Sequence, residues 1–163
     1  MIKQRTLHRT LSFQGKGIHT GRAVNLTVRP AAPESGIRFC RVDLNPALYA
    51  PAVVGNVRED EMRQTTLVVG NGVIRTIEHL MAAFHGMGVD NALVEVDGDE
   101  LPAMDGSSLP FTEAIQQAGL TEQDAPRHWI EVDKPVYVDR GDQSLIILPD
   151  PNFKISYTLS YRH

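Results

Sequence analysis

Apolar residues recur at helical spacing within residues 75–88. The positions i, i+3, i+4 and i+7 are occupied by Ile77, Leu80, Met81 and Phe84. This is the stripe of an amphipathic helix. Thr76 is the expected N-cap of the helix, and Gly86 or Gly88 its expected C-terminal stop. A second helix is expected over residues 109–118, by the same kind of pattern.

Alternation of apolar and polar residues predicts strands around these helices. The clearest case is Val24, Leu26 and Val28, a half-buried strand that ends at Pro30. A hairpin is expected around Gly70-Asn71-Gly72. Further strands are expected at residues 3–13, 37–42, 52–57 and 91–97. Residues 14–22 and 43–50 are expected to form a turn and a loop. Sheets and helices together predict an α+β protein.

The polar segment 121–127 interrupts this pattern and predicts a domain boundary. Residues 1–125 would then form a complete first domain, and residues 126–163 an incomplete second domain made of strands only. The strands expected in the second part are 129–132, 136–138, 144–148 and 153–161. About 36 residues cannot easily cover the apolar face of such a sheet. Either these strands pack on the first domain, or the chain is the front part of a longer protein.

Composition narrows the classes of partner and location. Sixteen basic against 20 acidic residues give a net charge of −4, which argues against nucleic acid as a main partner. The single cysteine, Cys40, excludes a disulfide framework and a cysteine zinc cage. No long apolar run is present, so no transmembrane segment is expected and the cytoplasm is the expected location.

Glu78 and His79 place an acid and an imidazole side by side at the start of the first predicted helix. The helix dipole favours a carboxylate there and disfavours a charged imidazolium. A neutral imidazole can bind zinc, and a neighbouring carboxylate can activate a metal-bound water. The alternative is a surface glutamate beside a partly buried histidine. Residue 82 is alanine, so the H-E-x-x-H pattern is not met, and any metal would need ligands from elsewhere.

The glycine-rich segment 14–22 carries Lys16, His19 and Arg22. One interpretation is a hairpin whose glycines supply positive φ angles. The other is a loop whose amides and cations bind an anionic ligand. Asp105, in the turn before the second helix, is interpreted as tying that turn to the helix start rather than as a catalytic group.

Several of these segments together resemble one known family. They occur in order along the chain as Thr6-Leu7, Gly17-Ile18-His19-Thr20-Gly21, Thr76-Ile77-Glu78-His79-Leu80-Met81-Ala82-Ala83, Gly88-Val89-Asp90-Asn91 and Met104-Asp105-Gly106-Ser107-Ser108 with Pro110-Phe111. The chain is similar over its whole length to the N-terminal half of the UDP-3-O-acyl-N-acetylglucosamine deacetylases, the zinc hydrolases that commit bacterial lipid A synthesis.

This resemblance implies two two-layer α+β domains of the ribosomal S5 domain 2-like kind that enclose a Zn²⁺ site. It makes His79 one of three zinc ligands, and Glu78 the general base that deprotonates zinc-bound water for attack on the acetamide. His19 would lie near the nucleotide-sugar end of the substrate, an acylated UDP-amino sugar. Met62 would contact ligands beside the metal.

The chain departs from the family pattern in one respect. The other two zinc ligands of the family, a His and an Asp in an H-K-x-x-D-type motif, lie in its second domain, as does its general-acid histidine. Residues 1–163 lack this motif. A fragment that is inactive alone is therefore expected, and exposed strand edges are expected to favour association of truncated chains. The alternatives are a non-catalytic nucleotide-sugar or acyl-ligand binding module, and a structural domain without a ligand.

Overall fold

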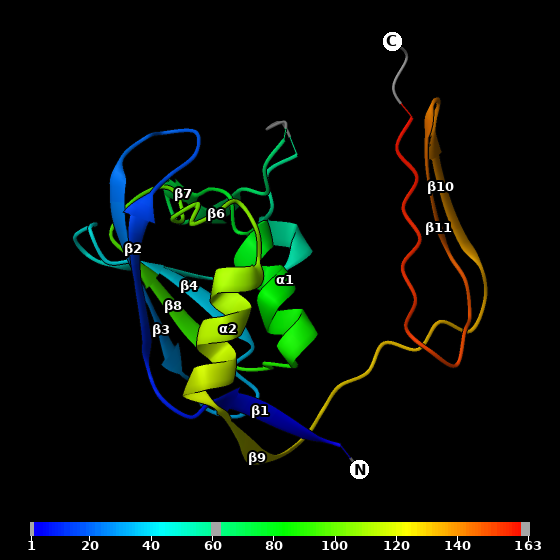
Figure 1. Cartoon of the computed structure of the whole chain (residues 1–163), viewed down its shortest axis with the longest axis horizontal. Coiled ribbons are helices and arrows are strands. Elements are labelled where there is room, and N and C mark those ends of the chain that lie inside the picture. The colour runs from blue at the N-terminus through cyan, green and yellow to red at the C-terminus, as the bar shows by residue number, and fades with distance from the viewer. Residues whose placement is uncertain (1, 60–62, 161–163) are drawn as a thin grey trace. The chain divides into compact units, whose positions relative to one another are not determined.

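The computed structural model describes residues 2–59 and 63–160. The chain divides into two compact units, Met1–Arg127 and His128–His163. In the described part of the first unit, two helices pack on a five-stranded sheet (Figure 1). The expected α+β class is confirmed. Neither helix within the described ranges is long and apolar enough to cross a membrane.

The main sheet of the first unit is antiparallel except between β8 and β4, which run parallel. In spatial order its strands are β2 (Leu11–Lys16), β3 (Ala23–Pro30), β8 (Ala92–Val96), β4 (Ile37–Arg41) and β5 (Leu48–Pro51). The alternation predicted for β3 is confirmed, because Val24, Leu26 and Val28 are buried. Leu26 pairs with Val96 and Val28 with Val94. These side chains form one apolar face of the sheet.

Helices α1 (Glu78–Met87) and α2 (Leu109–Ala118) cover this face side by side (Figure 1). The stripe predicted for α1 is present, since Leu80 and Phe84 are buried and Met81 packs against the core. Gly88 ends the helix with a φ of 69°, a left-handed conformation that glycine adopts without strain. The local sequence pattern therefore predicts the buried stripe of α1 and its C-terminal end correctly.

Helix α2 begins and ends at the predicted residues. Its buried residues are Phe111, Ile115 and Ala118, which recur at helical spacing on one face. The ring of Phe111 meets that of Phe13 on β2 edge to face, with centroids 5.0 Å apart, a favourable aromatic geometry. The contact fixes α2 against the edge of the sheet.

Substitution of Phe84 by alanine is expected to destabilise the first unit by about 3–5 kcal/mol, the usual cost of removing a buried phenylalanine ring. Phe84 is only 1% exposed, whereas Leu109 on the other helix is 55% exposed. A Leu109→Ala control should cost less than about 1 kcal/mol. Urea denaturation of the two variants and the wild type measures the difference. Equal effects would show that the core is not centred on α1.

The hairpin predicted around Gly70-Asn71-Gly72 is confirmed. Its strands are β6 (Leu67–Val69) and β7 (Gly72–Ile74), paired in antiparallel register. Two neighbouring predictions are wrong. The expected strand 52–57 contains instead a 3-10 helix, η1 (Val54–Asn56), and the expected loop 43–50 ends in strand β5. Strand β5 forms because the open edge of β4 offers it backbone partners.

One further prediction is wrong at the start of the first unit, and the segment at its end forms a strand. Residues 3–13 form two strands rather than one, because the chain turns at residues 8–10 between β1 (Lys3–Leu7) and β2. The polar segment 121–127, in which the domain boundary was predicted, forms most of strand β9 (Leu120–Pro126), and the first unit ends directly after this strand at Arg127. Strand β9 pairs antiparallel with β1. Its backbone is satisfied by a partner more than 100 residues away, which the polar side chains do not reveal.

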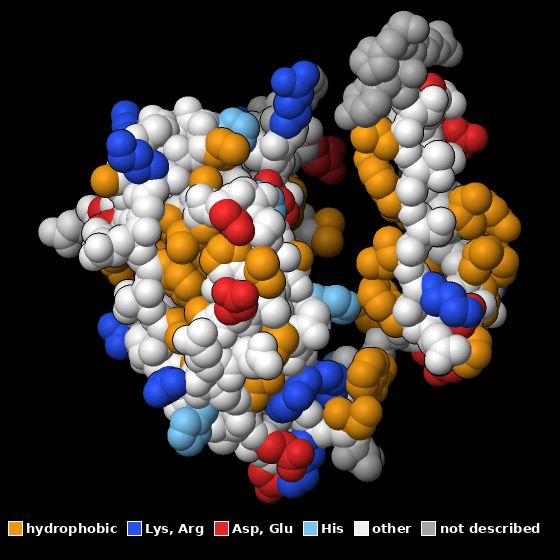
Figure 2. All heavy atoms as spheres, in the orientation of Figure 1, with side chains coloured by type: hydrophobic (Ala, Val, Ile, Leu, Met, Phe, Trp, Pro, Cys, Tyr) orange, Lys and Arg blue, Asp and Glu red, His pale blue; other side chains and the backbone are white. Residues whose placement is uncertain are grey.

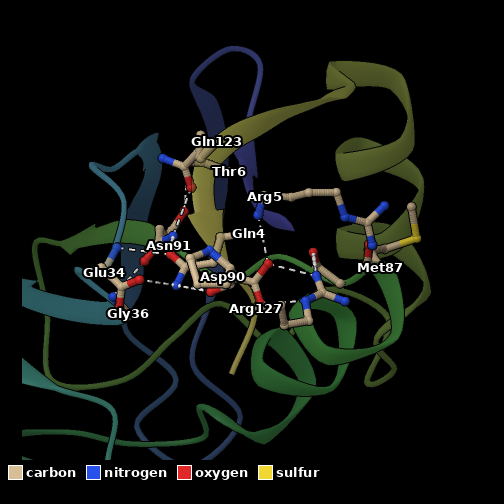
Figure 3. Close-up of polar contacts among 12 residues, drawn as sticks. Gln4, Arg5, Thr6, Glu34, Gly36, Met87, Asp90, Asn91, Gln123 and Arg127 are labelled. Atoms are coloured by element: carbon tan, nitrogen blue, oxygen red, sulfur yellow. Dashed lines mark hydrogen bonds and ion pairs between the residues drawn. The ribbon is translucent and has the colours of Figure 1, made fainter. Parts of the chain in front are cut away.

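Buried polar contacts tie this β1–β9 ribbon to the rest of the first unit (Figure 3). The Asn91 side chain, 1% exposed, accepts a hydrogen bond from Gly36 N at 2.8 Å and donates to Gln4 Oε1 and Gln123 Oε1, each at 2.8 Å. Buried polar groups are normally satisfied in this way. Asn91 thus joins β1, β9 and the turn before β4.

Two arginines hold the ribbon against the C-terminal end of α1 (Figure 3). Arg127 donates to both carboxylate oxygens of Asp90 at 2.9 and 2.7 Å, and to Gly88 O at 2.6 Å. Arg5 donates to Met87 O at 3.1 Å. Cations at a helix C-terminus are favoured by its dipole. The last residue of the first unit is therefore fixed to the helix that begins with Glu78.

The second unit contains a hairpin of β10 (Val136–Arg140) and β11 (Gln143–Ile147), joined at Gly141 with a φ of 69°. In the described residues the expected strands 129–132 and 153–160 do not form. Figure 2 shows hydrophobic side chains exposed over the hairpin. Its register pairs Val136 with Ile147 and Val138 with Leu145, so one face of the hairpin is apolar and exposed.

Candidate active site

The N-terminal end of α1 carries the predicted acid and imidazole, both partly buried. Glu78 Oε2 accepts a hydrogen bond from Thr65 N at 2.9 Å, which ties the segment before β6 to the helix start. His79 follows Glu78 in the first turn of the helix. One carboxylate and one imidazole are thus presented together at the start of a rigid helix.

Thr76 does not cap α1, so that prediction is wrong. The N-cap position is Ile77, which makes no side-chain cap hydrogen bond. Thr76 has a φ of 59° and its hydroxyl donates to Glu100 Oε1 at 3.1 Å. A β-branched residue rarely adopts this left-handed conformation. Hydrogen bonds from Arg75 N to Asp99 O and from Leu101 N to Arg75 O hold the segment there.

Asp105 lies in the turn that leads to α2 and is exposed. Its Oδ1 accepts hydrogen bonds from the hydroxyl and the backbone N of Ser107, both at 2.9 Å. The Ser107 hydroxyl and then its amide hold the pKa of Asp105 below its ordinary value, with a further contribution from His79. The geometry agrees with the interpretation of Asp105 as a turn residue.

The glycine-rich segment forms the loop of the β2–β3 hairpin, and Gly21 has a φ of 65°. The hairpin interpretation is therefore confirmed. The amides of His19 and Thr20 donate to Glu100 Oε1 and Oε2 at 2.9 and 2.8 Å. An internal carboxylate thus occupies the amides that an anionic ligand would need. The His19 side chain is exposed at the loop.

Glu100 is the functional candidate that sequence reasoning missed. It is 2% exposed, although charged residues are rarely buried. Burial raises the pKa of its carboxyl, but hydrogen bonds from the His19 backbone, from the Thr20 side chain and backbone, and from Thr76 outweigh burial and lower that pKa. A lone Glu after Gly98-Asp99 carries no sequence signal of such partners.

The depressed pKa of Glu100 predicts a specific loss of stability in acid. The ionised carboxylate stabilises the fold fully above its ordinary pKa of 4.5 and loses this effect as the pH falls through the lower folded-state pKa. The unfolding free energy of the wild type should therefore fall more steeply below pH 4.5 than that of Glu100→Gln. Urea denaturation between pH 3 and 7 measures both slopes. Parallel curves would contradict the prediction.

A cavity of about 380 Å³ lies beside the glycine-rich loop rather than at the start of α1. Its charged groups are paired with one another or with neighbouring residues outside the lining. Arg41 donates to both oxygens of Asp43, at 2.8 and 2.7 Å, and thereby lowers the pKa of that carboxyl. Asp99 is bonded to Arg75 at 2.7 Å. The lining does not include Glu78 or His79.

Comparison with known proteins identifies the family. Residues 4–163 match the family described as UDP-3-O-acyl N-acetylglycosamine deacetylase (LpxC). This chain belongs to that deacetylase family. It is 46% identical to the UDP-3-O-acyl-N-acetylglucosamine deacetylase of Saccharophagus degradans over 163 residues, and 47% identical to those of Teredinibacter turnerae and Methylococcus capsulatus. The alignments cover 100% of the chain but only 53–54% of each relative. The chain thus spans about half the length of these relatives.

The structure describes three of the four residues that the deacetylase resemblance assigned to the site. Glu78 and His79 are adjacent at the start of α1, and His19 lies on a loop bonded through Glu100 to Thr76. Met62 lies outside the described residues. Among the residues that the structure describes, no three His, Cys, Asp or Glu side chains are grouped closely enough to hold a metal ion. A catalytic zinc site generally has three protein ligands, which is more than the described residues bring together.

Proposed function

We propose that this chain is the first half of a zinc-dependent deacetylase that hydrolyses the N-acetyl group of a UDP-3-O-acyl-N-acetylglucosamine, the committed step of lipid A synthesis. The family match over residues 4–163 carries this proposal. The relatives that bear this name are about twice as long as the chain. The adjacent carboxylate and imidazole at the start of α1 support it. A metal-dependent amide hydrolase needs a general base beside a residue that can hold the metal.

Glu78 is the proposed general base. An amide is a poor electrophile, so its hydrolysis needs a base within reach of the attacking water and stabilisation of the oxyanion. The hydrogen bond from Thr65 N holds the Glu78 carboxylate in one orientation at the helix start. His79 is the proposed zinc ligand from this chain. Bound zinc would supply a Lewis acid that lowers the pKa of water.

The remaining zinc ligands and the general acid are proposed to come from the other half of the longer polypeptide. The described residues supply His79 without two further ligands grouped around it. We therefore propose that the 163-residue chain binds zinc weakly and is inactive alone. The remainder is proposed to form a second domain of the same ribosomal S5 domain 2-like kind, which β10 and β11 begin.

His19 is the proposed contact for the nucleotide-sugar end of the substrate. Its exposed side chain on a loop with a fixed backbone supports this role. For Met62 the proposed contact beside the metal rests on the family resemblance. We also propose that the protein acts in the cytoplasm, and that chains cut after residue 163 associate through the exposed apolar face of the β10–β11 hairpin.

Zinc content and deacetylation by the full-length protein test this proposal. One zinc per chain and release of acetate from UDP-3-O-acyl-N-acetylglucosamine are expected. His79→Ala should lower zinc affinity by at least about 100-fold, since loss of even a hydrogen-bond partner of a ligand costs 10- to 100-fold. His85→Ala is the matched control, because His85 lies exposed near the other end of α1 and should leave zinc binding unchanged.

The 163-residue chain should be measured in parallel. One tightly held zinc in this chain, lost in His79→Ala, would contradict the proposal that the site needs the other half. Binding of the UDP-sugar by the full-length protein without zinc and without hydrolysis would indicate the non-catalytic binding module instead.

A further inference from the structure

The Glu100 carboxylate lies between the two segments that carry the proposed site residues. Its Oε1 accepts hydrogen bonds from His19 N at 2.9 Å and from Thr76 Oγ1 at 3.1 Å. Its Oε2 accepts a hydrogen bond from Thr20 N at 2.8 Å. One carboxylate therefore joins the glycine-rich loop to the residue two positions before Glu78. Hydrogen bonds to a charged acceptor are the stronger kind.

The loop around Glu100 leaves no room for another side-chain atom. A Cβ atom added to Gly17 would overlap the Glu100 carboxylate and lie 2.6 Å from Thr20 Oγ1. Gly17 N donates to Arg22 O, and Gly21 N donates to Gly17 O, each at 3.0 Å. The backbone of the loop is thus closed directly over the carboxylate.

The segment on the other side of Glu100 is held in a sparsely populated conformation. Thr76 has a φ of 59°, and such residues persist only where their surroundings determine them. Arg75 contributes a bond from Nη1 to Asp99 Oδ2 at 2.7 Å, and Leu101 N bonds to Arg75 O at 3.1 Å. Helix α1 starts directly after this segment. The direction in which it presents Glu78 and His79 therefore depends on these contacts.

We propose that Glu100 is a positioning residue that fixes the glycine-rich loop and the start of α1 relative to each other. His19 and the Glu78–His79 pair can then contact the same substrate molecule. This inference rests on the proposed function for its catalytic meaning. The mechanical coupling itself is a property of the first unit. Misplacement of a reacting group by about 1 Å can cost 100-fold in rate, which gives such a residue a large effect without substrate contact.

Backbone amide NMR signals of the 163-residue chain test the coupling between the loop and the helix start. This test does not depend on enzymatic activity. In Glu100→Gln one acceptor oxygen becomes a donor group, so the His19 and Thr20 amides should exchange with solvent at least about 10-fold faster. The amide signals of Glu78 and His79 should shift as well. The control Glu95→Gln makes the same isosteric change at a carboxylate that pairs with Arg29 on the sheet surface. It should leave the amide signals of His19, Thr20, Glu78 and His79 unchanged. Changes confined to His19 and Thr20 would overturn the proposal.

A milder pair of variants keeps the test decisive if Glu100→Gln does not fold. Thr76→Val removes only the hydroxyl that bonds Glu100, and Thr76→Ser retains it. The loop amides of His19 and Thr20 should shift in Thr76→Val and return to the wild-type positions in Thr76→Ser. Loop signals that do not respond to Thr76→Val would overturn the coupling.

Kinetics of the full-length protein test the catalytic meaning. Glu100→Gln should lower kcat by about 100-fold, with zinc content unchanged. A normal kcat in Glu100→Gln, together with displaced amide signals, would overturn the positioning role. If the wild-type full-length protein does not hydrolyse the UDP-sugar, the proposed function fails, whereas the amide signals still report the coupling. The two failures are thus distinguishable.

Discussion

Replacement of Glu78 by glutamine is expected to lower kcat of the full-length protein by about 10²–10⁴-fold, the usual contribution of a general base. Glutamine has nearly the same shape and can still accept the hydrogen bond that Thr65 N donates to Glu78. The fold and the zinc content should therefore persist. Acetate release at saturating substrate, with zinc measured on the same samples, gives the result.

The matched control for this prediction is Glu95→Gln, which makes the same chemical change in β8. Glu95 pairs with Arg29 at 2.6 Å on the face of the sheet away from the helices, so its loss should leave kcat within about twofold. A Glu78→Gln protein with near-normal kcat would assign the base to another residue. A protein that lost zinc together with activity would show that Glu78 shapes the metal site rather than acting as the base.

Replacement of Asn91 by leucine is expected to destabilise the first unit by about 3–5 kcal/mol. The side chain loses its bonds to Gly36 N, Gln4 Oε1 and Gln123 Oε1. Each buried polar group left without a partner costs about 1–3 kcal/mol. Gln4 keeps its hydrogen bonds with Glu34 N and Pro126 O. The total destabilisation is therefore smaller than if all three groups lost their only partner.

Urea denaturation measures this loss, with Asn25→Leu as the control. Asn25 also bonds a neighbour, Asp97, but its side chain is exposed, so water can replace the bond and the cost should stay below about 1 kcal/mol. A similar midpoint for the two variants would show that the β1–β9 ribbon does not depend on Asn91. A lower m-value for Asn91→Leu alone would indicate that the ribbon detaches before the rest unfolds.

Sequence pattern predicted the parts of the fold that depend on neighbouring residues. The stripe of α1, both ends of α2 and the Gly70–Gly72 hairpin follow from spacing and from glycine conformations within a few positions. Glu78 and His79 were found as a candidate pair for the same reason, because they are adjacent in the chain. The family resemblance added roles for His19 and Met62 that no local pattern contains.

Only the tertiary structure decided the features whose partners are far away in the chain. Strand β9 is polar in its middle, residues 121–124, and forms because β1, more than 100 residues earlier, supplies its hydrogen bonds. The Thr76 hydroxyl does not cap the helix because it donates a hydrogen bond to Glu100. Glu100 also accepts a hydrogen bond from the backbone amide of His19, 81 residues earlier. A sequence shows the periods of helices and strands, but the satisfaction of a buried polar group depends on which distant atoms reach it. For that reason the acid–imidazole pair was predictable, and the carboxylate proposed to position it was not.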